Sequence, residues 1–128
     1  MNIKPNNWYQ AQVLRGNKLG RTINFPTINL NPNIVPNDTK QGVYASLVKI
    51  NDKNYKGAAY YGPRKVLNET KIVLEIFILD FDKNIYDEKV SFSLQQHIRR
   101  TMDFQKFSEL KKQLSRDIEA VKHYFGKY

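Results

Sequence analysis

The chain has 128 residues, a length that suits one domain over 1–128, and its 21 lysine and arginine residues outnumber 12 aspartate and glutamate residues, giving a net charge of +9. It has no cysteine, which excludes disulfides, thiolate chemistry, zinc ribbons and iron–sulfur clusters. Its two histidines leave little for a histidine-based metal site or a Ser-His-Asp relay. The basic excess suits a polyanion, an anionic membrane surface or a small anionic substrate, or it only keeps the protein in solution.

No stretch approaches the roughly 18 consecutive apolar residues that a membrane-spanning helix needs. No charged region followed by an apolar region opens the chain, so we see no signal peptide. We therefore expect a cytoplasmic protein that does not use a membrane as partner.

The first two thirds of the sequence predict strands. Runs of alternating, β-branched or aromatic residues are separated by turn residues, among them Asn51-Asp52 and Gly62-Pro63. The predicted strands are 8–14, 42–50, 56–61, 72–81 and 89–94. Short strands at this spacing are typical of an antiparallel sandwich or barrel.

The last third of the sequence changes to a helical period. Apolar residues recur every three or four positions and form one stripe, made of Phe104, Phe107, Leu110, Leu114, Ile118 and Val121. Ser108 is the expected N-cap and Gly126 the expected end. The pattern predicts a mostly β protein, with a barrel over about 8–98 and one C-terminal helix over about 104–125.

A loop rich in glycine and cations follows the first strand. Gly16, Lys18, Gly20 and Arg21 lie within six residues, and glycine lets backbone N–H groups approach a phosphate closely. The spacing is not that of a Walker motif, because no Gly-Lys-Ser or Gly-Lys-Thr follows. An ordinary hairpin loop with solvated charges explains the pattern equally well.

The next segment carries two oxygen-bearing side chains. Pro26 restricts Phe25 to extended geometry, and Thr27 and Asn29, two apart, point to one side of a strand. A hydroxyl and an amide oxygen form a candidate Mg²⁺ pair, because Mg²⁺ takes few protein ligands beside phosphates and water. Taken alone, the residues favour a turn and strand start with local hydrogen bonds.

Glu75 is the single carboxylate in an apolar run, 72–79. An ionised carboxylate is costly to bury unless it is paired or coordinated, so Glu75 either faces solvent or is held for a purpose. Its neighbours of the same strand parity are apolar, which weakens the solvent-facing interpretation. A partly buried glutamate with a raised pKa is a candidate general base.

Basic residues lie between the last strand and the helix. Arg99, at the expected end of the sheet, could meet a phosphate or a planar anionic ring. For Arg100 a charged connector is the better interpretation, and His97 and His123 are expected at the surface.

In their order, these motifs resemble those of the riboflavin kinase family, from about Tyr9 to about Val121. The most specific elements are Gly20-Arg21, Phe25-Pro26-Thr27 with Asn29, Gly42-Val43-Tyr44, Glu75 with Leu79-Asp80-Phe81, Ile98-Arg99, Phe104, and Leu114 through Asp117-Ile118-Glu119. The resemblance implies a six-stranded antiparallel Greek-key barrel with a C-terminal helix. It also implies transfer of the ATP γ-phosphate to the ribityl 5′-hydroxyl of riboflavin, giving FMN and ADP.

The same resemblance implies site residues. Thr27 and Asn29 would hold Mg²⁺ and the nucleotide phosphates, and Glu75 would accept the hydroxyl proton. The ATP phosphates would also meet Gly16, Lys18, Gly20, Arg21 and Pro26, and the flavin would meet Phe25, Arg99, Phe104 and Leu110. Such chemistry needs positioning and charge neutralisation, and requires neither histidine nor cysteine.

The sequence departs from the family pattern at several positions. Asn24 and Asp87 replace glycines, Phe77 replaces a histidine, and Ile28 replaces an alanine. Ile28 has the opposite parity to Thr27 and Asn29, so it should point away from the metal. The adenylyltransferase half of bifunctional relatives is absent, so FAD formation is not expected.

Two alternatives stay open. The departures motivate a catalytically weak flavin-binding module. The charge and the aromatic content motivate a small basic nucleic-acid-binding barrel, which is less favoured because the basic residues are scattered and no aromatic–basic motif stands out. We expect a monomer whose partners are riboflavin or FMN and ATP or ADP.

Overall fold

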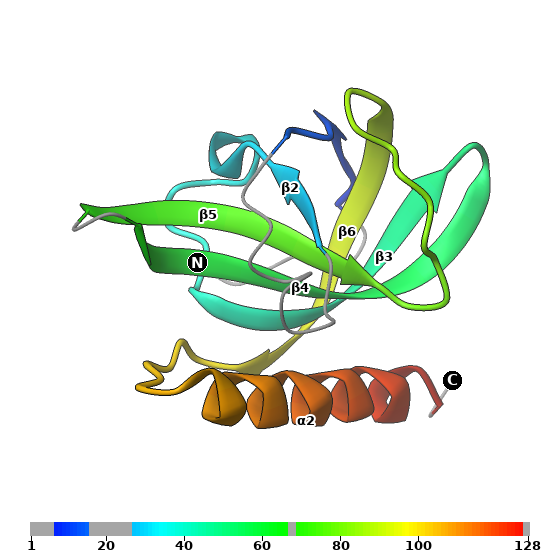
Figure 1. Ribbon diagram of the computed structural model, residues 1–128. Coiled ribbons are helices and arrows are strands. Elements are labelled where there is room, and N and C mark those ends of the chain that lie inside the picture. The colour runs from blue at the N-terminus through cyan, green and yellow to red at the C-terminus, as the bar shows by residue number, and fades with distance from the viewer. Residues whose placement is uncertain (1–6, 16–26, 67–68, 127–128) are drawn as a thin grey trace.

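The computed structural model describes residues 7–15, 27–66 and 69–126. The described residues form six strands, a 3₁₀ helix and one α-helix (Figure 1). These are β1 (Tyr9–Gln12), β2 (Ile28–Leu30), η1 (Pro32–Ile34), β3 (Gly42–Ile50), β4 (Lys53–Val66), β5 (Glu69–Ile78), β6 (Lys89–Arg99) and α2 (Phe107–Gly126). The expected phosphate-binding residues Gly16, Lys18, Gly20, Arg21 and Pro26, together with Asn24 and Phe25, lie outside the described residues.

The six strands form one antiparallel sheet in the order β1-β6-β3-β4-β5-β2. Strands β3, β4 and β5 form a meander, and β6 returns to lie beside β3, which is the Greek-key order. A backbone hydrogen bond of 2.7 Å from Leu14 to Asn29 links the chain after β1 to β2, so the barrel is nearly closed. The predicted fold is confirmed.

Alternation along the strands separates an apolar interior from an outer face. Val90, Phe92 and Leu94 are buried, as the alternation of their strand predicts. Ile28 and Leu30 also pack in the interior, so Ile28 points away from the side of Asn29, in agreement with its parity. On β5 the interior residues are Leu74, Ile76 and Ile78, and the residues between them belong to the outer face.

The predicted turns have mixed outcomes. Asn51 and Asp52 both have positive φ and connect β3 to β4. Gly62-Pro63 is not a turn, since both residues lie inside β4. The pairing of β4 with β3 ends at Tyr61, so Pro63 lies where β4 has an open edge, and there its missing N–H leaves no bond unmade. Asp87, the residue in place of a family glycine, has a φ of 68°, which glycine would adopt without strain.

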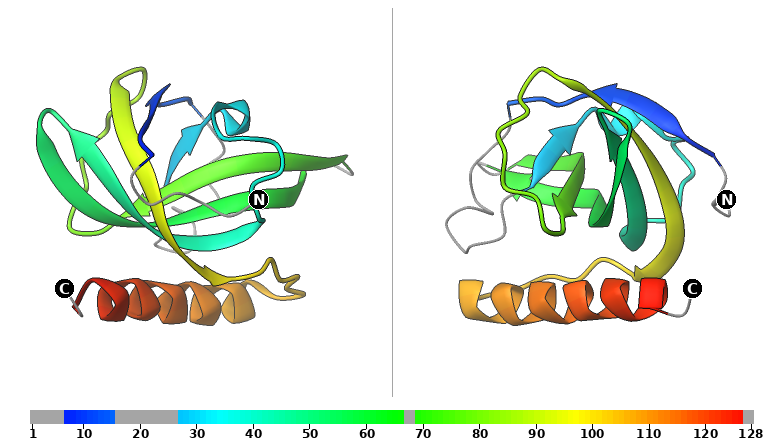
Figure 2. Two further views of the ribbon diagram at one scale, coloured as in Figure 1. Left: turned by 180° about the vertical axis from the view of Figure 1, so that it is seen from behind. Right: turned by 90° about the vertical axis from the view of Figure 1, so that its right-hand side faces the viewer.

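Helix α2 lies against the outside of the barrel (Figures 1 and 2). Val121, Ile118 and Tyr124 pack against Ala45 and Phe77 in a second apolar cluster. The predicted wet face of the helix, Lys111, Lys112, Arg116, Glu119 and Lys122, is exposed. The expected N-cap is wrong, because the Lys106 carbonyl accepts the first backbone hydrogen bonds and the helix begins at Phe107, which places Ser108 in the first turn.

Candidate active site

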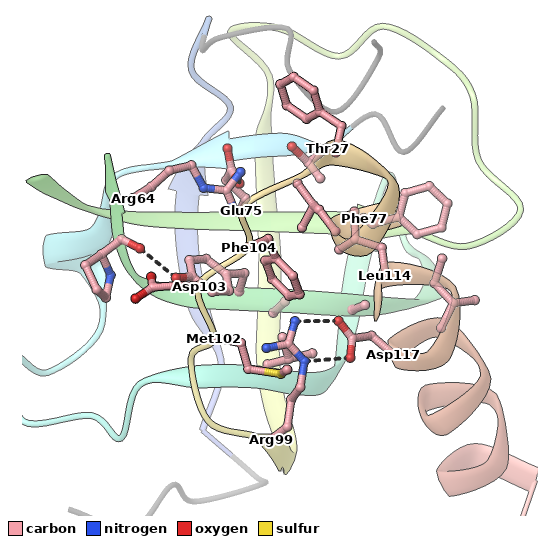
Figure 3. A pocket seen from close by; sticks show the side chains of 18 of the residues that line it. Thr27, Arg64, Glu75, Phe77, Arg99, Met102, Asp103, Phe104, Leu114 and Asp117 are labelled. Carbon is pink, nitrogen blue, oxygen red and sulfur yellow. Dashed lines mark hydrogen bonds and ion pairs between the residues drawn. The ribbon is translucent and has the colours of Figure 1, made fainter. Parts of the chain in front are cut away.

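A cavity of about 690 Å³ opens between the outer face of the barrel, the segment 102–106 and the first half of α2 (Figure 3). Thr27, Glu75, Arg99, Phe104 and Leu110 line it, all of them candidate site residues. Further lining residues include Tyr60, Arg64, Phe77, Met102, Asp103, Phe107, Leu114, Asp117 and Ile118. Segments far apart in the sequence therefore meet at one site.

One row of paired residues crosses five strands, and most of its members line the floor of this cavity. Arg99 pairs with Val43, Val43 with Tyr60, Tyr60 with Glu75, and Glu75 with Asn29. Directly opposite residues of antiparallel strands point to the same face. Neighbouring strands lie about 4.8 Å apart, so the row spans roughly 19 Å. Glu75 thus lies between Asn29 at one end and Tyr60 and Arg99 toward the other.

Glu75 lies on the outer face of the sheet and is nevertheless buried, with 4% of its surface exposed. The solvent-facing interpretation is therefore wrong. Its Oε2 forms an ion pair with Nη1 of Arg64 at 3.0 Å. Burial raises the pKa of the Glu75 carboxyl above its ordinary value, while the positive charge of Arg64 opposes that rise. A proton is therefore held more readily here than on a glutamate in water.

Arg64 and Tyr60 complete this part of the wall, and sequence reasoning missed both. The Arg64 guanidinium carbon lies 4.9 Å from the centroid of the Tyr60 ring, and the Tyr60 hydroxyl donates to the Pro63 carbonyl at 2.6 Å. Burial raises the pKa of Tyr60, so its hydroxyl stays a donor. The available signal was the same-parity spacing of Tyr60 and Arg64 on one strand, but only the register brings them to Glu75.

The second ion pair of the cavity joins β6 to α2. Arg99 donates from Nε and Nη2 to the two carboxylate oxygens of Asp117 at 2.7 and 2.8 Å (Figure 3). Gln113 donates to the same carboxylate at 3.0 Å. A further Arg99 nitrogen donates to the Arg100 carbonyl. Arg99 lines the cavity as a residue anchored on a buried carboxylate, and its role as a flavin contact stays a prediction.

Gly42 allows β3 to lie close to the end of β6, beside Arg99. Its φ is 141°, and a Cβ atom at this position would lie 2.0 Å from the Arg99 carbonyl oxygen. Only glycine allows β3 and the end of β6 to approach so closely. His97, expected at the surface, is half-buried, and its ring meets that of Tyr44 edge-to-face. His123 is exposed.

The oxygen donors near Glu75 suit a hard cation. Thr27 lines the cavity, and Asn29 pairs with Glu75 and is half-buried, although it is not among the lining residues. Among the described residues, no group of three or more histidine, aspartate or glutamate side chains could hold a metal by itself. Mg²⁺ with a nucleotide needs only one or two protein oxygens, so Thr27 and Asn29 fit it.

Comparison with known proteins identifies the family. The model of the riboflavin kinase (flavokinase) family matches residues 6–125, and the chain belongs to this family. A bifunctional riboflavin kinase/FMN adenylyltransferase of Haemophilus influenzae is 38% identical over 117 residues, which cover 91% of this chain and 38% of the relative. The chain thus spans less than half the length of that relative.

Solved structures agree in fold. A Streptococcus pneumoniae protein described as a macrolide-efflux protein matches with a TM-score of 0.75 and 30% identity, over 90% of this chain and 38% of the other. Riboflavin kinase from Trypanosoma brucei matches with a TM-score of 0.63 and 20% identity, over 94% and 80% of the two chains, and shares the fold. Within the part of the chain that the structure describes, no helix has the length and apolar character to cross a membrane.

Proposed function

We propose that the chain transfers the γ-phosphoryl group of ATP to the ribityl 5′-hydroxyl of riboflavin, giving FMN and ADP. Family membership supports this reaction. The observation that carries the proposal is the placement of Glu75. A buried carboxylate stands in a paired row next to Asn29, and it lines one cavity together with Thr27 and apolar side chains such as Phe104.

The two substrates would bind to different parts of this site, with their reacting groups meeting near Glu75. Asn29 and Thr27 would receive the phosphate chain, and Phe104 and Leu110 would receive the flavin ring against the helix. The acceptor hydroxyl would then lie near Glu75. As its oxygen forms the new bond to the γ-phosphorus and the bond to the ADP oxygen breaks, the hydroxyl proton passes to the Glu75 carboxylate. Atoms and charge balance in this step.

Mg²⁺ is the metal that we propose for Thr27 and Asn29. When bound, it would neutralise charge on the ATP phosphates. The protein's own contribution is to orient the two substrates and to keep water from the acceptor hydroxyl, for which the apolar walls around Phe77 and Leu114 are suited.

The direct test is incubation of the chain with riboflavin, ATP and Mg²⁺, followed by chromatography for FMN. FMN and ADP formed in equal amounts support the proposal. Riboflavin bound without FMN would instead support the flavin-binding module. Retardation of single-stranded DNA without flavin binding would support the nucleic-acid-binding barrel. The monomeric state and the cytoplasmic location stay predictions.

A further inference from the structure

The ion pair with Arg64 occupies only some of the hydrogen-bond acceptor positions of the Glu75 carboxylate. Nη1 of Arg64 lies 3.0 Å from Oε2, and no other partner of Glu75 is found among the described residues. A carboxylate can accept about four hydrogen bonds, two at each oxygen. Oε1 therefore has capacity for a donor that enters the cavity.

Arg64 is itself held in one place. Its guanidinium lies over the ring of Tyr60, whose hydroxyl is tied to the Pro63 carbonyl, and only 25% of the Arg64 side chain is exposed. Tyr60 pairs directly with Glu75 across β4 and β5, so ring, guanidinium and carboxylate form one packed unit. A stacked, planar cation fixes a carboxylate more firmly than a flexible ammonium group would.

We propose that Arg64 is a positioning residue that occupies Oε2 of Glu75 and thereby leaves Oε1 as the atom that takes the proton of the acceptor hydroxyl. This inference rests on the proposed function. Arg64 acts through Glu75: it sets the rotation of the carboxylate relative to the cavity and makes no bond to either substrate. Misplacement of a reacting group by about 1 Å costs on the order of 100-fold in rate.

A double-mutant cycle tests this role against direct contact of Arg64 with a phosphate. In the wild-type background, Arg64→Met should lower kcat by about 100-fold, while KM for riboflavin and for ATP changes little. Arg64→Lys should recover part of the loss. In the Glu75→Gln background, where no base remains to position, Arg64→Met should change kcat by less than about threefold. Arg116→Met, an exposed arginine on α2, is the matched control and should leave kcat unchanged.

The outcomes separate the two proposals. If the wild type forms no FMN, the proposed function fails and this inference falls with it. If the wild type is active and Arg64→Met lowers kcat equally in both backgrounds, Arg64 acts on something other than Glu75 and only the inference is overturned. Unchanged kcat in Arg64→Met also overturns it. Circular dichroism melting checks that each variant folds, and Arg64→Lys replaces the methionine variant in the cycle if that variant unfolds.

Discussion

Two arginine–carboxylate pairs line the same cavity, and they differ in how completely the carboxylate is used. Asp117 is 3% exposed and accepts from two nitrogens of Arg99 and from Gln113. Glu75 is 4% exposed and meets one nitrogen of Arg64. The two carboxylates are therefore equally buried, but Asp117 meets more hydrogen-bond donors than Glu75.

The difference fits a structural role for the first pair and the base proposed at the second. A buried charge is tolerable when its lone pairs are filled, and the Arg99–Asp117 pair meets that condition while it ties α2 to β6. Glu75 keeps unfilled acceptor capacity and a raised pKa, both of which a general base needs. The fully paired Asp117 ties the helix to the barrel, whereas Glu75, which meets a single arginine nitrogen, keeps acceptor capacity for the proposed proton transfer.

The largest expected effect is that of Glu75→Gln on activity. The amide keeps the size of the side chain but accepts protons poorly, so kcat should fall by about 10²- to 10⁴-fold. The affinity for ATP should stay nearly unchanged, because Glu75 is not proposed to bind it. Steady-state FMN formation and equilibrium binding of an ATP analogue measure the two quantities, and undiminished turnover would remove Glu75 as the base.

Asp117→Asn should have the next largest effect, which is a loss of stability. It leaves the Arg99 guanidinium, whose side chain is only 14% exposed, without its counter-charge, which costs about 3 kcal/mol of the free energy of unfolding. Glu119→Gln, on the exposed face of the same helix, is the matched control and should cost less than about 0.5 kcal/mol. Urea unfolding gives both values. Equal losses in the two variants would show that Arg99–Asp117 contributes no more than a surface pair.

The contrast between the two pairs also marks how far the sequence can predict the site. Glu75 is conspicuous in the sequence because one carboxylate interrupts an apolar run, and the fold class follows from short alternating strands before an amphipathic helix. Arg64 is not conspicuous, because its partner is set by the register of β4 on β5. A shift of one residue would turn Arg64 to the other face of the sheet, away from Glu75. The register depends on two strands and the turn between them, so the sequence around Arg64 does not reveal its partner.

The bounds of the strands likewise depend on pairing with neighbouring strands more than on local sequence signals. The predicted strand 42–50 agrees with β3, whereas 56–61 is only the middle of the 14-residue β4. Gly62 and Pro63 are good local turn signals, and pairing with Val73 and Ile72 of β5 overrides them. The strand continues to Val66 and so carries Arg64 to the cavity wall.

Gln113→Met should have a smaller effect of about 1 kcal/mol on the free energy of unfolding. It removes the third donor to Asp117 while both Arg99 contacts stay in place. Ser115→Ala, whose hydroxyl is exposed and bonds only to its own helix, should change stability by less than about 0.5 kcal/mol. Thermal or urea unfolding compares the two variants. A loss for Gln113→Met as large as that for Asp117→Asn would mean that Gln113, and not Arg99, satisfies the carboxylate.

The smallest effect is a pH dependence of stability that Glu75 carries. Its pKa in the folded chain is raised above the ordinary value of 4.5, so the folded state holds the proton over a pH range in which the unfolded state has lost it. Stability must therefore fall as pH rises through that range. Below pH 4.5 both states are protonated and the penalty is absent. Relative to Glu75→Gln, the wild type should lose unfolding free energy as the pH rises above 4.5, as measured by urea unfolding at a series of pH values. A difference that grows in the opposite direction would mean that the attraction of Arg64 outweighs burial, and Glu75 would then be as well satisfied as Asp117.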